Sequence, residues 1–205
     1  MITIDIEKTY TYGEYSFINY TQLLEENKRK VLDWRNDESI RKNMYNTEEI
    51  PLDSHLAFID SLSRRKDRYY WMVSCSGEPL GSVNITDVDY ENSSAELGYY
   101  LRPDLMGGGK GISFIFNLLA FVFEVLGLNS LYGATNVENK PASLIDEYFG
   151  FKLTGQKKLI INGQETVFLE HILTASEFEN NKEEKKDIEN LIRFMRQWKK
   201  NNKNR

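Results

Sequence analysis

The most informative stretch of the chain reads ELGYYLRPDLMGGGKG at residues 96–111. The run from Ala95 to Leu101 has the apolar and aromatic composition of a β-strand, and Gly107 to Gly111 form a glycine-rich loop. A nearly all-apolar helix is expected next, from Ile112 to Leu126, and a helix of that composition must be covered on most of its sides. The stretch therefore predicts a strand, a loop with accessible backbone and a buried helix in succession.

The glycine-rich loop has the chemistry of an anion site. Glycines at alternate positions leave backbone N–H groups uncovered, and the start of the following helix adds the positive end of its dipole. Such a loop suits a pyrophosphate, with Lys110 as a further cation. It is not the loop of a nucleotide-hydrolysing P-loop protein, because Gly111 stands where Ser or Thr is required.

The elements on either side follow from hydrophobic periodicity and turn residues. Before the stretch we expect strand-like segments up to residue 24, a helix over 25–34, a helix introduced by Pro51, and strands over 69–75 and 80–90. After it we expect a strand over 130–135, a helix over 140–148 ended by Gly150, and a hairpin of strands 157–161 and 165–172 around Asn162-Gly163. This order predicts an α+β fold with a mixed, mostly antiparallel central sheet flanked by helices, and not a dinucleotide-binding βα alternation.

Length and composition indicate one domain over 1–175 with a helical extension over 176–205. The 40% hydrophobic content provides a core, which excludes a disordered chain. One cysteine and two histidines exclude a disulfide scaffold and predict that no metal is bound. The first ten residues lack the layout of a signal peptide and no apolar run suits a membrane span, so a cytoplasmic protein with a reduced Cys75 and no membrane partner is expected.

The charge is unevenly distributed along the chain. Residues 182–205 carry nine basic and four acidic side chains, which leaves a net charge of -10 on the rest. An acidic body makes nucleic acid an unlikely partner. The apolar residues of the tail lie on one helical stripe: Ile188, Leu191, Ile192, Met195 and Trp198. An amphipathic C-terminal helix is therefore expected to dock on its own domain or in a homodimer, with an anionic surface as the alternative.

Four pieces of the sequence, in order, resemble the GNAT family of acetyl-CoA-dependent N-acetyltransferases. They are the strand over 96–103, the glycine-rich loop, Asn139, and the ending Phe149-Gly150-Phe151. The resemblance implies a GNAT fold, acetyl-CoA as cosubstrate without a metal, and a thioester docked at Gly98, Tyr99 and Tyr100. The residues it implies for cofactor binding are Leu101, Met106, Gly107, Gly108, Gly109, Lys110, Gly111, Ser113 and Asn139.

Two positions depart from the family pattern. Gly108 replaces a polar residue at the start of the loop motif, and Asp146 stands where many members have a tyrosine that protonates the leaving thiolate. The expected mechanism is direct attack of an amine on the thioester, with no acyl intermediate on Cys75. The candidate catalytic residues are Glu96 as a base acting through water, Tyr99, and Asp146 or Tyr148 as the acid, with water as the other choice.

A narrower resemblance covers Trp34-Arg35-Asn36 and scattered positions up to Phe58. It is to the N-acetyltransferases of pseudaminic acid biosynthesis, which acetylate the 4-amino group of a UDP-linked amino-dideoxy sugar. It implies a sugar-nucleotide substrate in contact with four residues: Arg35, Met44, His55 and Tyr99. Protein N-terminal or other small-amine acetyltransferases are the first alternative, and a non-catalytic module that binds a coenzyme or nucleotide is the second.

Overall fold

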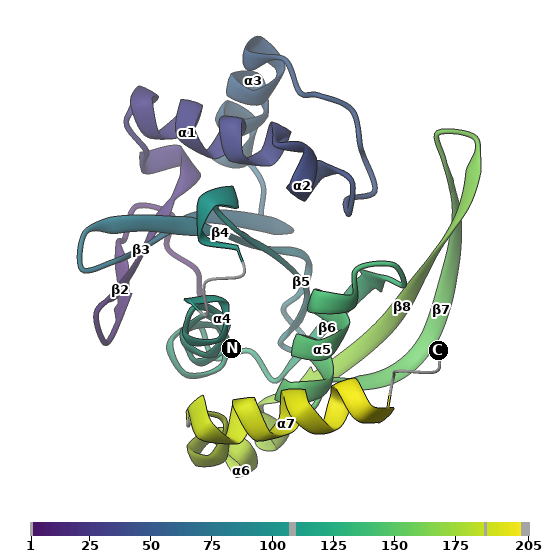
Figure 1. Ribbon diagram of the computed structural model, residues 1–205. Coiled ribbons are helices and arrows are strands. Elements are labelled where there is room, and N and C mark those ends of the chain that lie inside the picture. Colours follow the sequence, from purple (N-terminus) through teal and green to yellow (C-terminus); the bar gives the residue numbers. More distant parts are fainter. Residues whose placement is uncertain (1, 107–109, 187, 202–205) are drawn as a thin grey trace. The chain divides into compact units, whose positions relative to one another are not determined.

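The computed structural model describes residues 2–106, 110–186 and 188–201, which form two compact units, Met1–Leu131 and Tyr132–Arg205 (Figure 1). The first unit is built on an antiparallel sheet whose five strands follow chain order. These strands are β1 (Tyr10–Tyr12), β2 (Tyr15–Asn19), β3 (Arg68–Cys75), β4 (Glu78–Asp89) and β5 (Ser94–Leu101).

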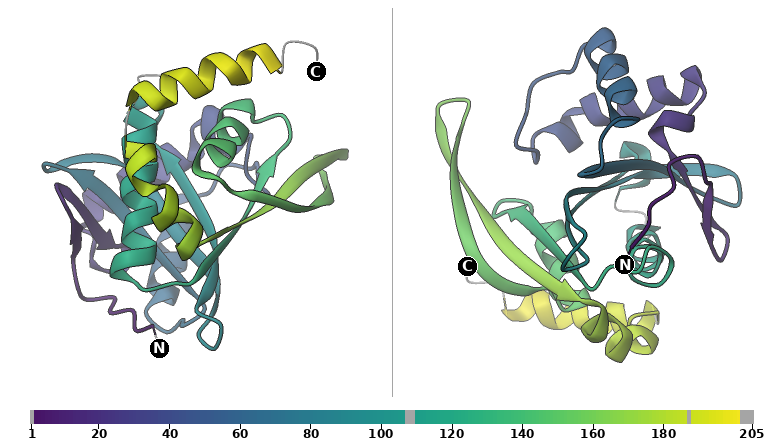
Figure 2. Two further views of the ribbon diagram at one scale, coloured as in Figure 1. Left: turned by 90° about the horizontal axis from the view of Figure 1, so that it is seen from below. Right: turned by 180° about the vertical axis from the view of Figure 1, so that it is seen from behind.

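Helices cover both sides of this sheet (Figures 1 and 2). One side is covered by the 3-10 helix η1 (Tyr20–Gln22) and by α1 (Glu25–Asn36), α2 (Glu38–Arg41) and α3 (Leu52–Leu62). The other is covered, after the 3-10 helix η2 (Pro103–Leu105), by α4 (Lys110–Ala120) and the π-helical turn η3 (Phe121–Val125) that continues it. Because side chains alternate along a strand, Met72 packs with Val31 and Ile59 under α1 and α3, whereas Trp71 contacts Phe121 on the other side.

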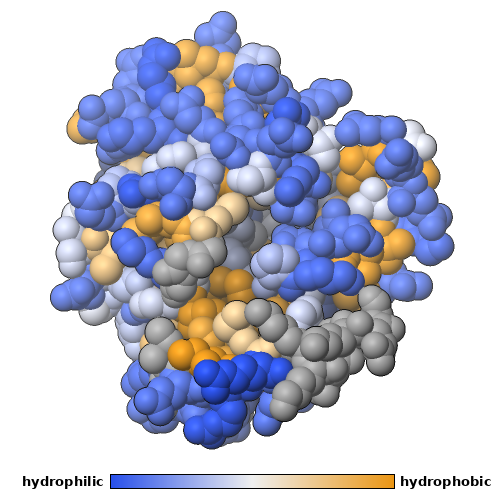
Figure 3. Space-filling view, viewed as in Figure 1, coloured by the Kyte–Doolittle hydropathy of each residue, from blue (hydrophilic) through white to orange (hydrophobic). Residues whose placement is uncertain are grey.

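The second unit combines a long hairpin with three helices. Its elements are most of β6 (Ser130–Asn136), α5 (Lys140–Phe149), β7 (Lys152–Ile161), β8 (Gln164–Thr174), α6 (Ala175–Lys186) and α7 (Ile188–Asn201). The strands lie in the order β6-β8-β7. The expected turn joins β7 to β8, with Asn162 at φ 52° and Gly163 at φ 77°, the left-handed conformations that this dipeptide favours. The space-filling view shows apolar side chains over this hairpin, where Ile160 is 72% exposed (Figure 3).

The C-terminal segment is two helices, α6 and α7, where one amphipathic helix was expected. α7 lies along α5 (Figure 2). The indole of Trp198 donates to Glu147 Oε2 at 2.8 Å, and the ring of Phe194 packs edge-on against Tyr148. This helix therefore docks on its own unit, one of the two expected arrangements.

Most predicted helices and strands are confirmed, with shifts at their ends, but residues 20–22 of the segment expected to be strand-like form the 3-10 helix η1. The helix expected from Ile112 begins at Lys110, so Lys110 and Gly111 belong to its first turn and not to the loop. It leaves α geometry at Phe121, ten residues into the apolar run, and ends at Val125 as a π-helix. The hairpin is longer at both ends than expected. Within the described ranges, no helix has the length and apolar character to cross a bilayer.

Candidate active site

The side of the first unit's sheet that α1 and α3 cover carries a group of polar side chains. Alternation turns Glu96, Gly98 and Tyr100 of β5 to this side, and turns Tyr99 to the α4 side. With their register partners on β3 and β4 these residues make up the α1 face: Arg68, Tyr70, Met72, Ser82, Asn84, Thr86, Glu96, Gly98 and Tyr100. Tyr99, like Arg35, was expected to contact the substrate. Because its side chain points to the α4 side of the sheet, the structure does not support that contact.

A hydrogen-bonded tyrosine network forms the buried part of the α1 face. Tyr20 Oη lies 2.6 Å from Ser82 Oγ and 3.2 Å from Tyr100 Oη, and Tyr100 Oη donates to the carbonyl of Val31 in α1 at 3.2 Å. Burial raises the pKa of both tyrosines, well above the ordinary value for Tyr20. Both hydroxyls are therefore neutral in the physiological range and tie β4 and β5 to η1 and α1.

Arg35, in the last turn of α1, has an incomplete set of partners. Its Nη2 donates to the carbonyl of Asn46 at 2.7 Å, and its Nη1 is buried without a hydrogen bond to any part of the chain that is described. Burial lowers the pKa of this guanidinium, and the hydroxyls of Tyr100 and Tyr20 act in the opposite direction, which places them near it. A buried guanidinium nitrogen without an acceptor is a binding group for an oxygen of a ligand.

Two further expected substrate contacts lie elsewhere on these helices. His55 is 5% exposed, and its Nε2 lies 3.0 Å from the carbonyl oxygen of Lys28. Burial lowers the pKa of this imidazole. His55 therefore links α3 to α1, and its ring is not presented to a substrate. Met44 lies half-buried in the turn after α2, where its N–H donates to Arg41.

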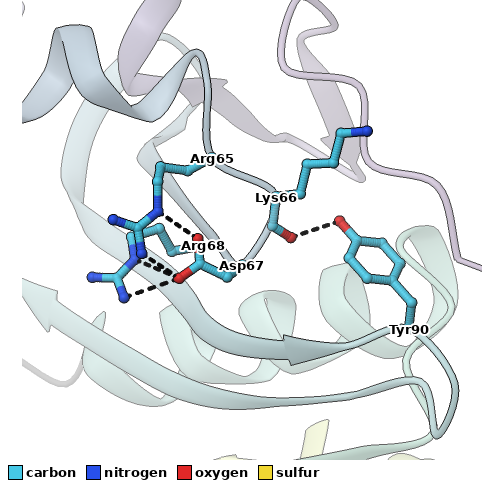
Figure 4. Close-up of polar contacts among 5 residues, drawn as sticks. All are labelled: Arg65, Lys66, Asp67, Arg68 and Tyr90. Atoms are coloured by element: carbon cyan, nitrogen blue, oxygen red, sulfur yellow. Dashed lines mark hydrogen bonds and ion pairs between the residues drawn. The ribbon is translucent and has the colours of Figure 1, made fainter.

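An arginine pair borders the α1 face at the start of β3 (Figure 4). Arg65 Nε donates to Asp67 Oδ1 at 2.6 Å, and Arg68 donates to Asp67 Oδ2 at 3.1 Å. The Arg65 hydrogen bond holds the pKa of the Asp67 carboxyl well below its usual range. The hydroxyl of Tyr90 fixes the loop by donating to the carbonyl of Lys66. Two guanidinium groups on one carboxylate leave this border with a net positive charge.

Charged side chains act on Tyr70, in the middle of the α1 face. Burial raises the pKa of the Tyr70 hydroxyl, Arg68 and Arg35 lower it, and Glu96 raises it. Tyr70 thus lies among one carboxylate and at least two guanidinium groups. The candidate base Glu96 shares this surface with the cations that border it.

The expected pyrophosphate site is described only in part. Gly107, Gly108 and Gly109 lie outside the described residues. Lys110 is exposed at the start of α4, and open space surrounds the position of a Cβ at Gly111. Ser113 Oγ lies 2.9 Å from Tyr15 Oη, and Met106 is exposed. The first-turn N–H groups of α4 have no partner within the helix, so this end fits an anion.

In the second unit, Asp146 of α5 is 6% exposed. Its Oδ2 accepts a hydrogen bond from Thr135 Oγ1 on β6 at 2.6 Å and lies 3.9 Å from His171 Nδ1 on β8. Burial raises the pKa of Asp146 to about 6, although the Thr135 hydrogen bond lowers it. His171 Nδ1 is buried and has no hydrogen bond within the described ranges. Asp146 is thus a carboxylic acid that titrates near neutral pH.

Tyr148 points away from Asp146, on the side of α5 that α6 and α7 cover. It is 1% exposed, and its hydroxyl donates to the carbonyl of Lys185 at 3.3 Å. This position does not support Tyr148 as the proton donor. Asn139 caps α5 by accepting from the N–H of Ala142, and Leu101 is half-buried at the end of β5.

Several of these polar groups were not predicted from the sequence. Ser82, Asn84 and Thr86 alternate with the apolar residues Val83 and Ile85, and this alternation would have placed them on one face. No comparable pattern indicates Thr135 or the Arg65 and Arg68 pair. In the ranges 2–106, 110–186 and 188–201, no three His, Cys, Asp or Glu side chains are grouped to hold a metal ion.

Comparison with known proteins gives a family match and several relatives. The family model of the acetyltransferase (GNAT) domain matches residues 21–152. Acetyltransferase PseH of Campylobacter jejuni is 24% identical over 140 residues, which are 68% of this chain and 86% of that protein.

Two solved structures have a similar fold. The spermidine N-acetyltransferase of Vibrio cholerae in complex with CoA and spermine has a TM-score of 0.73 at 20% identity, over 82% of this chain and 99% of that one. Campylobacter jejuni PseH in complex with acetyl coenzyme A has a TM-score of 0.59 at 19% identity, over 78% of this chain and 98% of that one. The fold class expected from the sequence is confirmed.

Proposed function

The chain belongs to the GNAT acetyltransferase family, and from this we propose that it acetylates the 4-amino group of a UDP-linked amino-dideoxy sugar in pseudaminic acid biosynthesis. As a member of that family it is an N-acetyltransferase, and acetyl-CoA supplies the acetyl group as a thioester. The likeness to PseH and the motif around Trp34 support the choice of acceptor. The structural observation that best supports this acceptor is the buried Nη1 of Arg35, which has no hydrogen-bond partner among the described residues.

An acceptor with a diphosphate suits the charges of the α1 face. Arg35 has a buried nitrogen that needs an oxygen partner, and the pair Arg65 and Arg68 keeps a net positive charge with Asp67. Guanidinium groups bind phosphate oxygens strongly, whereas they repel a polycation. These residues therefore favour a nucleotide-linked sugar over a polyamine such as spermidine.

The proposed base is Glu96. It lies on β5 two residues before Gly98, on the same side of the strand, and its charge acts on Tyr70 in the middle of the α1 face. An ammonium group has no lone pair, so a proton must leave the acceptor before attack. Glu96 takes that proton through water, and backbone N–H groups of β5 stabilise the oxyanion that forms on the thioester carbonyl.

The proposed proton donor to the leaving thiolate is Asp146. Its pKa of about 6 leaves part of the population protonated near neutral pH, and Thr135 orients the carboxyl by donating to Oδ2. The parent thiol of the leaving group has a pKa near ~8.5, so transfer from this acid is downhill. The amine attacks directly, and Cys75 carries no acyl group.

The test is release of free thiol from acetyl-CoA with three acceptors. They are UDP-4-amino-4,6-dideoxy-N-acetyl-β-L-altrosamine, spermidine and a basic peptide with a free N-terminus, and Glu96→Gln is the control variant. We expect kcat/KM for the sugar nucleotide to exceed the other two by at least ~100-fold, or about 2.7 kcal/mol. Release with only the peptide or spermidine would overturn the choice of acceptor.

Absence of thiol release with every amine would indicate the non-catalytic alternative. In that case acetyl-CoA at 100 times its Kd should still stabilise the protein by about 2.7 kcal/mol in a thermal-shift experiment. A protein that neither turns over nor is stabilised would contradict the assignment of acetyl-CoA itself.

A further inference from the structure

The mechanism proposed above gives no role to Asn84, a polar residue on the α1 face. Asn84 lies in the middle of β4, opposite Tyr70 on β3 and Gly98 on β5. It is half-buried, and its carboxamide makes no hydrogen bond to another residue in the ranges that the structure describes. A carboxamide offers two donors and one acceptor, so a half-buried one without partners is available to a ligand.

The position of this carboxamide is fixed by its neighbour on β5. A Cβ built on Gly98 would lie 2.7 Å from Asn84 Oδ1 and 2.8 Å from Nδ2. The amide group of Asn84 therefore lies over the α-carbon of Gly98, in space that a side chain at position 98 would occupy. The resemblance to the GNAT family implies that the thioester docks at Gly98. The Asn84 amide therefore lies next to the expected position of the thioester carbonyl.

The surroundings of Asn84 define what it can contact. Glu96 and Tyr100 are its diagonal neighbours on β5, and Ser82 and Thr86 flank it on its own strand. Tyr100 and Ser82 are already bonded to Tyr20, which leaves Asn84 as the neutral group between them and the candidate base. A neutral amide in that place can donate to a sugar hydroxyl or accept from an amine N–H.

We propose that Asn84 is a specificity-determining residue that hydrogen-bonds the acceptor next to its reacting amine, and that position 98 is glycine because any side chain there displaces this amide. The proposal rests on the proposed function in one respect: the acceptor lies on the α1 face. It does not depend on which amine is the natural acceptor.

The experiment compares Asn84→Ala with the parent protein on whichever acceptor the parent acetylates. We expect the KM for that acceptor to rise about tenfold, in the range that loss of one hydrogen bond produces. The KM for acetyl-CoA should stay within about twofold, and the melting temperature should not fall, because no protein partner is lost. Asn92→Ala, an exposed asparagine in the turn before β5, is the matched control and should change neither KM.

A second pair of variants tests the geometry without turnover. Gly98→Ala should lower the melting temperature, since its Cβ meets the Asn84 amide, and Asn84→Ala in the Gly98→Ala background should restore most of that loss. An additive double variant would contradict the packing argument.

The outcomes separate the two proposals. A parent protein that acetylates an amine, with an unchanged acceptor KM in Asn84→Ala, overturns the role of Asn84 and leaves the proposed function standing. Equal increases in both KM values, or a melting temperature lowered by several degrees, would show a structural role and overturn it as well. A parent protein that acetylates no amine defeats both proposals.

Discussion

Replacing Asp146 by asparagine should stabilise the protein at neutral pH much more than at pH 4. Burial raises the pKa of the folded-state carboxyl to about 6, whereas an unfolded chain has a value near ~3.9. The folded state therefore holds this proton more tightly. The stability that results is fully present below about pH 4 and is lost as pH rises through about 6.

The magnitude follows from the difference between these two values. About two pKa units at 1.36 kcal/mol each give a loss of roughly 3 kcal/mol between pH 4 and pH 7. Asparagine has the same shape and does not titrate. The difference in unfolding free energy between Asp146→Asn and the parent should therefore move by roughly 3 kcal/mol in favour of the variant over this interval.

The assay is urea unfolding of both proteins at half-unit intervals from pH 4 to pH 8, with the difference plotted against pH. Asp60→Asn, which removes an exposed carboxylate from α3, controls for the change in net charge. A difference between Asp146→Asn and the parent that stays constant with pH would contradict the raised pKa of Asp146. A difference that moves against the variant as pH rises would refute it too.

Further predictions concern the site residues and their neighbours. Asp146→Asn should lower kcat by ~100-fold or more because the proposed proton donor is lost. In Thr135→Ala the decline of kcat with pH should move to higher pH, because the hydrogen bond that lowers the Asp146 pKa is removed. A pH profile of kcat measures both effects. Arg35→Gln should raise the KM for the sugar nucleotide ~10-fold or more without changing the KM for acetyl-CoA, and Arg35→Lys should restore it only in part, measured by steady-state kinetics. Cys75→Ala should retain turnover in the thiol-release assay, and complete loss would indicate an acyl-enzyme. Tyr148→Phe should reduce the unfolding free energy by about 1 kcal/mol and leave kcat unchanged, since its hydroxyl donates to the main-chain carbonyl of Lys185.

Local signals made most of the fold predictable. The Asn162-Gly163 turn, the Pro51 start of α3 and the apolar run after Gly111 each act over a few residues, and the structure has the element that each one predicts. The ends of elements were less predictable. The change to π-helix at Phe121 has no local signal, because the apolar residues on either side of it continue the same helical pattern.

The candidate site was less predictable because its residues depend on contacts between distant segments. His55 meets a carbonyl 27 positions earlier, and Tyr148 meets one 37 positions later, so neither ring is available although both residue types suit a site. Thr135 reaches Asp146 only because β6 lies beside α5. The pattern of Ser82, Asn84 and Thr86 is the exception, since strand alternation alone assigns them to one face.

In the mechanism proposed here, Asp146 takes the place of the tyrosine that many family members have, and this changes the energetics of the last proton transfer. A tyrosine with a pKa near ~10 keeps its proton at pH 7 but gives it to a thiolate, whose thiol has a pKa near ~8.5, uphill by about 2 kcal/mol. Asp146, with a pKa of about 6, would give it downhill by about 3 kcal/mol, although only about a tenth of the molecules would carry the proton at pH 7. That tenfold loss in population equals about 1.4 kcal/mol, which is less than the gain in driving force. A buried carboxylic acid can therefore replace the phenol, but its rate declines above about pH 6, whereas a tyrosine donor keeps its proton up to about pH 10.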